Sequence, residues 1–533
     1  MAMSDPANIV LTGFMGVGKT AVGREVAARL GRKFVDMDAV IAARAGLSIP
    51  EIFSQQGEAA FREMEAGLVR ELAGQRGLVI ATGGGALVDV GNRERMARTG
   101  LVVCLTAGVD DILARVGGEE AGARRPLLAG PDARARAMDL LERRAAAYAE
   151  IPFHIATDGR GVQETADEVI ALAEREPGGL LRLPVRTPDG RYDILLGRGL
   201  LPTLPRRLAE RGLSGRVAVI SDEAVAPAWA GVVEEAFAAA GRPAEVVVLP
   251  AGESHKHLGT VAAIYDRLIE AGLDRKGVVV ALGGGVIGDM AGFAAATYLR
   301  GVAFVQVPTT LLAMVDASVG GKVGVDLRQG KNLVGAFKQP GLVLIDPDML
   351  ASLPASEFRN GLAEVVKHGL IADPDLFAQL EAEGPESLES LLARALRVKI
   401  GVVERDPFEQ GERAYLNLGH TFGHAFEQVS GYTLPHGQGV ALGLIAASEL
   451  AAARGLCPPD LPARITALLA RLELPARLTG FDPAAVLAAM STDKKREAGR
   501  LRFVLPHAVG RVALHDDVSP ADVLAVLGRP GVE

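Results

Sequence analysis

The chain has 533 residues, of which 49% are hydrophobic and 23% charged, and its formal net charge is −8. At roughly 100–200 residues per domain, this length predicts several domains with sizeable apolar cores. The negative charge argues against nonspecific binding to nucleic acid. Two cysteines, Cys104 and Cys457, provide neither a disulfide framework nor a cysteine zinc site, which fits a reducing cytosol. No apolar run predicts a signal peptide or a membrane span, so we expect a cytoplasmic protein.

Short apolar runs alternate with helical patterns over the first 175 residues, which is typical of a parallel sheet with flanking helices. This pattern ends at a cluster of helix breakers, Glu176-Pro177-Gly178-Gly179. We therefore predict a first domain over 1–176 and a linker over 177–184. Within the domain, the sequence predicts strands at 7–12, 78–81 and 101–105, and helices at 19–30 and 161–174.

A second α/β rhythm begins near residue 183, and its strand signals fade after residue 346. Most of 356–490 has helical periodicity. We therefore predict an α/β chain whose second half is a Rossmann-like subdomain over 185–345, followed by a mostly helical subdomain over 346–533. The expected strands are 217–220, 245–249, 277–282, 302–307 and 342–345, with a short final pair at 501–505 and 510–514.

A phosphate-binding loop follows the first predicted strand. Residues 13–20, Gly-Phe-Met-Gly-Val-Gly-Lys-Thr, match G-x-x-x-x-G-K-[ST] and open a predicted helix, as this motif requires. Backbone N–H groups wrap the phosphates of a nucleotide in such loops. Lys19 can reach the β- and γ-phosphates, and the Thr20 hydroxyl can hold Mg²⁺. The predicted ATP-binding residues of the loop are Gly16, Val17, Gly18, Lys19 and Thr20.

Two features after the loop suggest a small acceptor. Asp36 and Asp38 end the next apolar segment, where strand alternation puts both carboxylates on one face. One carboxylate can assist Mg²⁺ while the other grips a substrate hydroxyl. Arg62 has Glu65 three residues later, which is a helical contact spacing.

Further along, glycines and cations complete the pattern. Residues 83–85 are three glycines after a predicted strand, and they permit a ligand to approach the backbone closely. The segment Arg124-Arg125-Pro126-Leu127-Leu128 adds cations, as does Arg144, which precedes Tyr148 by four residues. Taken singly, each arginine is equally typical of a solvated helix face.

Together these features resemble the shikimate kinase family over residues 7–175: a P-loop, a D-x-D strand, F-R-x-x-E, three glycines, an R-P-L-L lid and R-x-x-x-Y, in that order. The resemblance implies ATP-dependent phosphorylation of shikimate to shikimate 3-phosphate, with Lys19, Asp38 and Arg125 in catalysis. Arg125 would close over ATP, and Thr20 with Asp36 would hold Mg²⁺. A related small-metabolite kinase, such as a gluconate kinase, is the alternative. The implied shikimate-binding residues are Asp38, Arg62, Gly84 and Arg144.

In the second half, residues 283–288 match G-x-G-x-x-G after a predicted strand. The usual dinucleotide site also needs an acidic residue about 20 positions later, at the end of the next strand. That strand ends instead in Pro308-Thr309-Thr310, while Asp289 follows the glycines directly. Any NAD site must therefore be a variant of the usual one.

Candidate metal ligands gather in the helical subdomain. They are Glu364, His368, His420, His424 and His436. Catalytic zinc commonly takes two histidines and a glutamate with open positions, and His420 and His424 have the i, i+4 spacing of one helix face. Cations crowd the same region and favour an anionic substrate; they include Arg300, Lys322, Lys331, Lys367, Lys399, Arg413, Lys494 and Lys495.

Residues 185–515 resemble the 3-dehydroquinate synthase family. The matching strings are G-G-G-V-I-G-D-M-A-G-F, V-P-T-T-L-L-A-M-V-D-A-S-V-G-G-K, G-L-A-E-V-V-K and N-L-G-H-T-F-G-H-A-F-E. The resemblance implies NAD- and metal-dependent conversion of 3-deoxy-arabino-heptulosonate 7-phosphate to 3-dehydroquinate and phosphate. It assigns Glu364, His420 and His436 to Zn²⁺ or Co²⁺, and His424 to the substrate instead. It also implies a homodimer through this half, in which Arg300 reaches the neighbouring site.

The same resemblance distributes the remaining roles. The implied NAD contacts are Asp222, Glu253, Lys256, Gly284, Gly285, Asp289, Thr309, Thr310, Lys322, Lys331 and Ser352. The implied substrate contacts are Arg300, Asp316, Lys331 and Asn332, and the implied catalytic residues are Lys322, Lys367, Lys399, Arg413, Asn417, His424 and Lys494. The alternatives for this half are a related sugar-phosphate cyclase or a polyol dehydrogenase. A different class of alternative is that one half is a non-catalytic binding module.

Overall fold

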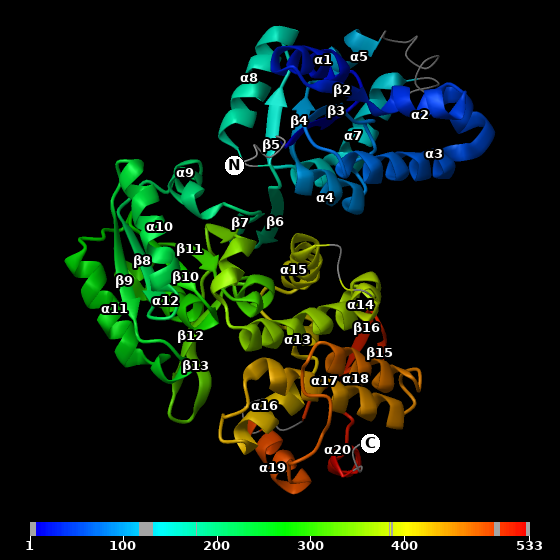
Figure 1. The fold of residues 1–533 in the computed structure, drawn as a ribbon. Helices are drawn as coiled ribbons and strands as arrows, with labels where there is room; N and C mark the ends of the chain where they lie inside the picture. Colours follow the sequence, from blue (N-terminus) through cyan, green and yellow to red (C-terminus); the bar gives the residue numbers. More distant parts are fainter. Residues whose placement is uncertain are drawn as a thin grey trace. The chain divides into compact units, whose positions relative to one another are not determined.

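The computed structural model describes residues 7–116, 132–176, 178–382, 384, 387–494 and 501–528, without the side chains of 491–494. The chain forms two compact units, Met1–Pro184 with Leu195–Gly199, and Val185–Ile194 with Leu200–Glu533 (Figure 1). Both contain a sheet with flanking helices, which confirms the predicted α/β class. Among the described residues, the helices include none with the length and apolar character to cross a membrane.

The first unit is built on a five-stranded sheet in the order β2-β3-β1-β4-β5, with parallel neighbours. The central strand β1 is fully buried, and apolar side chains of β1 and β4 pack with those of α1 and α8. Because the strands are parallel, their carboxyl ends meet at one edge, where the P-loop follows β1. The strands are β1 (Asn8–Gly13), β2 (Lys33–Asp36), β3 (Leu78–Ala81), β4 (Gly100–Thr106) and β5 (Phe153–Ala156).

Several of the described helices of this unit begin with a side-chain N-cap. Ser48 and Glu51, for example, form a reciprocal capping box at the start of α3. The helices are α1 (Lys19–Leu30), α2 (Met37–Ala45), α3 (Ile49–Ala73), α4 (Val90–Thr99), α5 (Val109–Val116), α7 (Ala133–Ala149) and α8 (Val162–Arg175).

The second unit holds a seven-stranded sheet in the order β6-β7-β14-β11-β10-β8-β9. In the run β14-β11-β10-β8 each strand pairs in parallel with the next, and these strands are almost wholly buried, as expected for strands covered on both faces. The strands are β6 (Leu181–Thr187), β7 (Gly190–Leu196), β8 (Val217–Asp222), β9 (Ala244–Leu249), β10 (Val278–Gly283), β11 (Ala303–Pro308) and β14 (Leu342–Ile345). The segment expected to be a linker, 177–184, thus includes the start of β6.

The described residues include two antiparallel hairpins, of which the sequence predicted one. The pair β15 (Phe503–Ala508) and β16 (Arg511–His515) confirms the predicted final strands. The hairpin of β12 (Lys322–Leu327) and β13 (Gly330–Phe337) was not predicted, and it carries Lys322, Lys331 and Asn332. Half of β13 is exposed and it lacks an apolar run, so periodicity gave no signal there.

Helices make up most of the chain after β14, as predicted. α13 packs against α15 and α17, and α16 packs against α17. The helices before β14 are α9 (Leu204–Ala209), α10 (Ala226–Ala239), α11 (Leu258–Glu270) and α12 (Gly285–Thr297). Those after it are α13 (Ala355–Ala372), α14 (Pro374–Glu381), α15 (Leu388–Arg405), α16 (His420–Val429), α17 (His436–Ala453), α18 (Leu461–Arg471), α19 (Pro483–Lys494) and α20 (Pro520–Leu527). Short turns are η3 (Leu201–Thr203), η4 (Glu253–His255), η5 (Tyr298–Arg300), η6 (Ala313–Ala317), η7 (Pro347–Ser352) and η8 (Glu412–Asn417).

Candidate active sites

The loop between β1 and α1 is shaped for a phosphate chain. Gly16 and Gly18 have φ of 82° and 95°, a left-handed backbone that glycine adopts without strain. The first turn of α1 holds no acidic residue, so the positive end of the helix is open to an anion. Lys19 Nζ donates to the carbonyl oxygens of Gly13 and Phe14, at 2.9 Å in both cases. The loop therefore presents N–H groups and one ammonium group together.

Thr20 and Asp36 meet beside this loop, where the Thr20 hydroxyl donates to Asp36 Oδ2 at 2.7 Å. The predicted strand alternation of Asp36 and Asp38 is wrong. β2 ends at Asp36, whose carboxylate accepts from Ala39 N and caps α2, and Asp38 lies in the first turn of that helix. Aspartate is a strong N-cap, which explains why the backbone turns into a helix at this position.

Asp38 nevertheless faces Gly83, the first of the three glycines. A Cβ placed on Gly83 would lie 2.8 Å from Asp38 Oδ1 and 2.5 Å from Glu65 Oε1, so only glycine leaves room for both carboxylates. Glu65 is 1% exposed and pairs with Arg62, as the helical spacing predicted. Burial raises the pKa of the Glu65 carboxyl, although the Arg62 guanidinium opposes the shift.

The other two glycines meet the predicted arginines. A Cβ on Gly85 would lie 2.5 Å from Arg62 Nη1. The Gly84 carbonyl oxygen accepts from Arg144 Nη1 at 2.9 Å and from the Tyr148 hydroxyl at 2.7 Å. Two guanidinium groups and one carboxylate thus surround a glycine backbone, which forms a cradle for a small hydroxylated anion. The proposed lid residue Arg125 lies outside the described residues.

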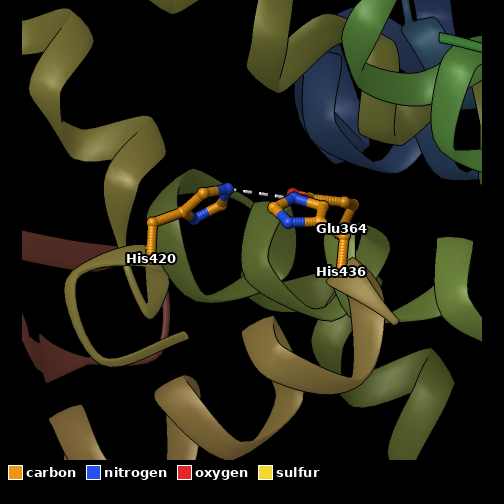
Figure 2. A group of neighbouring side chains, drawn as sticks. All are labelled: Glu364, His420 and His436. Atoms are coloured by element: carbon orange, nitrogen blue, oxygen red, sulfur yellow. Dashed lines mark ion pairs between the residues drawn. The ribbon is translucent and has the colours of Figure 1, made fainter. Parts of the chain in front are cut away.

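In the second unit, Glu364, His420 and His436 come together from three helices (Figure 2). Glu364 Oε1 lies 3.5 Å from His420 Nε2 and 3.6 Å from His436 Nε2. The Glu364 side chain is 1% exposed. Burial by itself raises the pKa of the Glu364 carboxyl, but the Lys367 ammonium group and His420 hold it well below its usual range. A buried anionic oxygen facing two imidazole nitrogens is a typical donor set for a divalent cation.

Glycines allow these helices to approach closely. His436 is the first residue of α17, and a Cβ on the next residue, Gly437, would lie 2.6 Å from the Cα and carbonyl carbon of Asn360 in α13. His420 is the first residue of α16, after Gly419 with a φ of 79°. The ligand positions are therefore fixed by backbone packing as well as by side chains.

His424, the other member of the i, i+4 pair, faces the same group less directly. Its ring centroid lies 5.4 Å from that of His420 and 5.9 Å from that of His436. It joins a second set of donor atoms, with Glu427 and His436, which overlaps the first. The Nε2 atoms of His420 and His436 both point toward Glu364, whereas the resemblance reserves His424 for the substrate.

Cations surround Asp316 next to the metal-ligand candidates. Asp316 Oδ1 lies 2.7 Å from Lys399 Nζ and 3.8 Å from Lys367 Nζ, and Lys367 also pairs with Glu364. His368 Nε2 is 3.6 Å from the same oxygen. Burial alone raises the pKa of the Asp316 carboxyl, but Lys399 and Lys367 bring it well below its usual range. Asp316 lies in η6, a π-helical turn, a feature often found at functional sites.

Glu409 is a site residue that the sequence reasoning missed. Its carboxylate pairs with Lys322 and accepts from Asn417 Nδ2 at 3.3 Å. Burial raises the pKa of Glu409, but the contact with Lys322 lowers it below its ordinary value. Its φ is 60°, an unfavourable conformation for glutamate that the surrounding contacts must hold. Arg413, four residues later, is buried and donates to the Gly320 carbonyl oxygen at 2.8 Å.

Five of the predicted NAD residues lie at the carboxyl ends of β8, β10 and β11, namely Asp222, Gly284, Gly285, Thr309 and Thr310. Gly284 and Gly285 open α12, whose first turn has no acidic residue. Lys256 Nζ lies 2.6 Å from Asp289 Oδ2 and donates to Asn332 Oδ1 at 2.6 Å. Asp222 ends β8, Thr309 and Thr310 directly follow β11, and a further predicted residue is Ser352, whose hydroxyl accepts from Trp229.

Among the described side chains, one predicted residue is not drawn into these groups and another lies at their edge. Arg300 is exposed in η5, with a φ of 68°, and none of the described contacts joins it to the other predicted residues. Glu253 is exposed and lies 3.7 Å from Lys331 Nζ, and its charge also acts on Lys256 and Asp289. The side chain of Lys494 lies outside the described residues.

The geometry defines two kinds of catalytic machinery in one chain: a P-loop phosphotransferase site, and a metal-ligand cluster beside a dinucleotide-type sheet. The sequence model of the shikimate kinase family matches residues 15–174. The models of the N-terminal and C-terminal 3-dehydroquinate synthase domains match residues 246–360 and 361–496. The chain belongs to the 3-dehydroquinate synthase family and carries a fused shikimate kinase domain.

Individual relatives agree with this assignment. A 3-dehydroquinate synthase from Pelobacter propionicus is 48% identical over 336 residues, covering 62% of this chain and 94% of that protein. A 3-dehydroquinate synthase from Paracoccus denitrificans is 47% identical, and the match covers 63% of this chain and 96% of that protein. Among solved structures, a 2-epi-5-epi-valiolone synthase from Streptomyces hygroscopicus with NAD⁺ and Zn²⁺ bound has 32% identity and a TM-score of 0.59, covering 63% and 95%. The chain is thus a bifunctional enzyme of the shikimate pathway, with kinase and synthase activities.

Proposed function

We propose that the first unit transfers the γ-phosphate of ATP to the 3-hydroxyl of shikimate. The supporting observation is the cradle of Asp38, Arg62 and Arg144 around the three glycines. Two guanidinium groups suit a planar carboxylate, and Asp38 can accept a hydrogen bond from the attacking hydroxyl and orient it. Lys19 would stabilise charge on the transferred phosphate, while Thr20 and Asp36 would hold Mg²⁺.

The second unit would convert 3-deoxy-arabino-heptulosonate 7-phosphate to 3-dehydroquinate and phosphate. The observation that carries this proposal is the Glu364, His420 and His436 cluster beside the cations around Asp316. The donor set fits Zn²⁺, because the buried Glu364 Oε1 faces the Nε2 atoms of both histidines while Oε2 pairs with Lys367. When bound, zinc polarises a substrate hydroxyl toward hydride transfer. Lys367 and Lys399 would meet the charges of the substrate.

NAD⁺ would lie against the opening of α12, with its pyrophosphate at Gly284 and Gly285. Lys256 and Asp289 would hold neighbouring polar groups, since both are already fixed by their mutual ion pair. When bound, NAD⁺ would supply reversible hydride transfer and would not be consumed. Lys331, Asn332 and Arg413 would hold the substrate's anionic ends.

The second candidate for this half is another sugar-phosphate cyclase, because the valiolone synthase from Streptomyces hygroscopicus is similar over nearly its whole length. The identity to 3-dehydroquinate synthases is higher, 48% against 32%. We therefore favour the heptulosonate phosphate as substrate. We also propose a cytoplasmic homodimer formed through the synthase half, in which the exposed Arg300 contacts the partner subunit.

Two assays on the purified chain test both activities. One supplies ATP, Mg²⁺ and shikimate; the other supplies the heptulosonate phosphate, NAD⁺ and Zn²⁺ and follows phosphate and dehydroquinate. Lys19→Met should abolish only the first activity and Glu364→Gln only the second. The matched controls are Lys33→Met and Glu357→Gln, both exposed, the latter on the same helix as Glu364. Loss of both activities from either active-site change would contradict two independent sites.

A further inference from the structure

His436 is held from both sides by carboxylates. Its Nε2 faces Glu364, and its Nδ1 lies 2.8 Å from Oε1 of Glu427. The Glu427 side chain is 2% exposed, so the carboxylate of this contact is buried, while the His436 side chain is 33% exposed. His420 Nδ1, by comparison, lies 3.2 Å from the neutral carbonyl oxygen of Leu418, and no carboxylate faces it among the described residues. The two histidines that face Glu364 therefore have different support.

The backbone is built to keep Glu427 in this place. Glu427 is seven residues after His420 in α16, which is two helical turns and the same face. Helix α17 passes close to Glu427 at Gly439. A Cβ on Gly439 would lie 3.2 Å from Glu427 Cγ and 3.3 Å from its Oε1. A larger residue at 439 would crowd the carboxylate away from His436.

The second oxygen of Glu427 has its own partner. Lys331 Nζ of the β12–β13 hairpin lies 3.3 Å from Glu427 Oε2 and 5.3 Å from the centre of the Tyr432 ring. A carboxylate this deeply buried requires a counter-charge, and Lys331 supplies it. One oxygen thus serves the imidazole and the other the lysine.

We propose that Glu427 is a positioning residue for the metal centre, an inference that rests on the proposed ligand set Glu364, His420 and His436. An imidazole that binds a metal through Nε2 must keep its proton on Nδ1, and a carboxylate acceptor there fixes the tautomer and the ring orientation. Glu427 fixes His436 in this way. Through Lys331 it also connects this ligand to the hairpin that carries the predicted substrate contacts.

The test is the Zn²⁺ affinity of the full chain, stripped with a chelator and measured by competition with a chromogenic chelator. Glu427→Ala should weaken binding about 10- to 100-fold, the usual cost of losing such a partner. Glu427→Gln keeps an acceptor for Nδ1 and should fall between wild type and Glu427→Ala. The matched control is Glu357→Gln, which removes the same charge from an exposed position in the first turn of α13. Its Zn²⁺ affinity should equal that of the wild type.

A Co²⁺-loaded sample gives a second readout, because its visible absorption bands report ligand geometry and should shift in Glu427→Ala. Wild-type affinity in both Glu427 variants, with binding lost in Glu364→Ala, would overturn this inference and leave the metal site standing. If Glu427→Ala loses Zn²⁺ binding as completely as Glu364→Ala, Glu427 is a metal ligand, and its role as a positioning residue is also overturned. A wild-type chain that binds no Zn²⁺ would refute the proposed ligand set itself. If Glu427→Ala fails to fold, as judged by loss of NAD⁺ binding, the test is the Zn²⁺ affinity of Glu427→Gln compared with that of the wild type.

Discussion

Gly437 follows His436 at the start of α17, where this helix passes the main chain of α13. A Cβ at Gly437 would lie 2.6 Å from the Cα and carbonyl carbon of Asn360, and closer still to its carbonyl oxygen. Non-bonded carbon atoms are comfortable at about 3.5–4.0 Å, so Gly437→Ala must push the two helices apart by about 1 Å. No flexible side chain is involved that could absorb the displacement.

This displacement acts directly on the metal centre. His436 moves with α17, while Glu364 stays with α13, and ligand distances in metal sites tolerate only about 0.2 Å. A misplacement of about 1 Å at a catalytic group costs on the order of 100-fold in rate. Overpacking of this kind also destabilises a fold by about 1–3 kcal/mol. We therefore expect Gly437→Ala to lose about 100-fold in synthase rate and to bind Zn²⁺ more weakly.

The assay is Zn²⁺ competition together with synthase turnover, with kinase turnover of the same chain as the internal reference. Gly231→Ala is the matched control, because Gly231 lies in α10 and a Cβ there meets no atom within 4 Å. That control should keep both activities and gain slightly in stability, since alanine favours helix over glycine by about 0.5–1 kcal/mol. Wild-type Zn²⁺ affinity and turnover in Gly437→Ala would refute the packing argument.

Three further outcomes are expected. Arg62→Lys removes the planar recognition of a carboxylate and should raise the KM for shikimate about tenfold or more. The control is Arg70→Lys, at an exposed position of the same helix, and equal KM values in the two variants would count against the cradle. Burial raises the pKa of Cys104 to about 12, so alkylation of the folded chain at pH 8, read by mass spectrometry, should modify the half-buried Cys457 and spare Cys104; equal labelling rates would contradict this. Burial alone would lower the pKa of His436, but its carboxylate neighbours raise it to about 9, so below pH 9 a metal must displace a proton. Zn²⁺ affinity should therefore rise about tenfold per pH unit between pH 6.5 and 8, and a flat profile in chelator competition would show that His436 is already neutral.

The parts of the fold that the sequence predicted are those where one local signal dominates. The helix Lys19–Leu30 and the strands Leu78–Ala81 and Leu342–Ile345 have the predicted bounds, because a glycine loop or an apolar run delimits each of them. Asp38 shows the limit of such reasoning. The run Phe34-Val35-Asp36-Met37-Asp38 alternates like a strand, but the capping preference of Asp36 prevails and places Asp38 in a helix.

Residues whose role depends on distant partners left almost no trace in the sequence. Glu427 ends one of the strings that carry the family resemblance, and its spacing of seven residues from His420 was the available signal. Glu409 offered even less, since its partner Lys322 is 87 residues away. Only the fold brings the β12–β13 hairpin to the helical subdomain, and that hairpin itself lacks a strand-like apolar pattern.

The lysines illustrate why a count of charges in the sequence overstates the positive charge available to a substrate. They suggested a strongly positive pocket, yet each described lysine of this group pairs with an acidic side chain; the pairs are Lys256–Asp289, Lys322–Glu409, Lys331–Glu427, Lys367–Glu364 and Lys399–Asp316. An anionic substrate therefore does not enter a field of free cations. It must share these ammonium groups with carboxylates that are already in place, or displace them. Affinity then comes from the direction in which each fixed ammonium group points, and this property of the fold is invisible in composition.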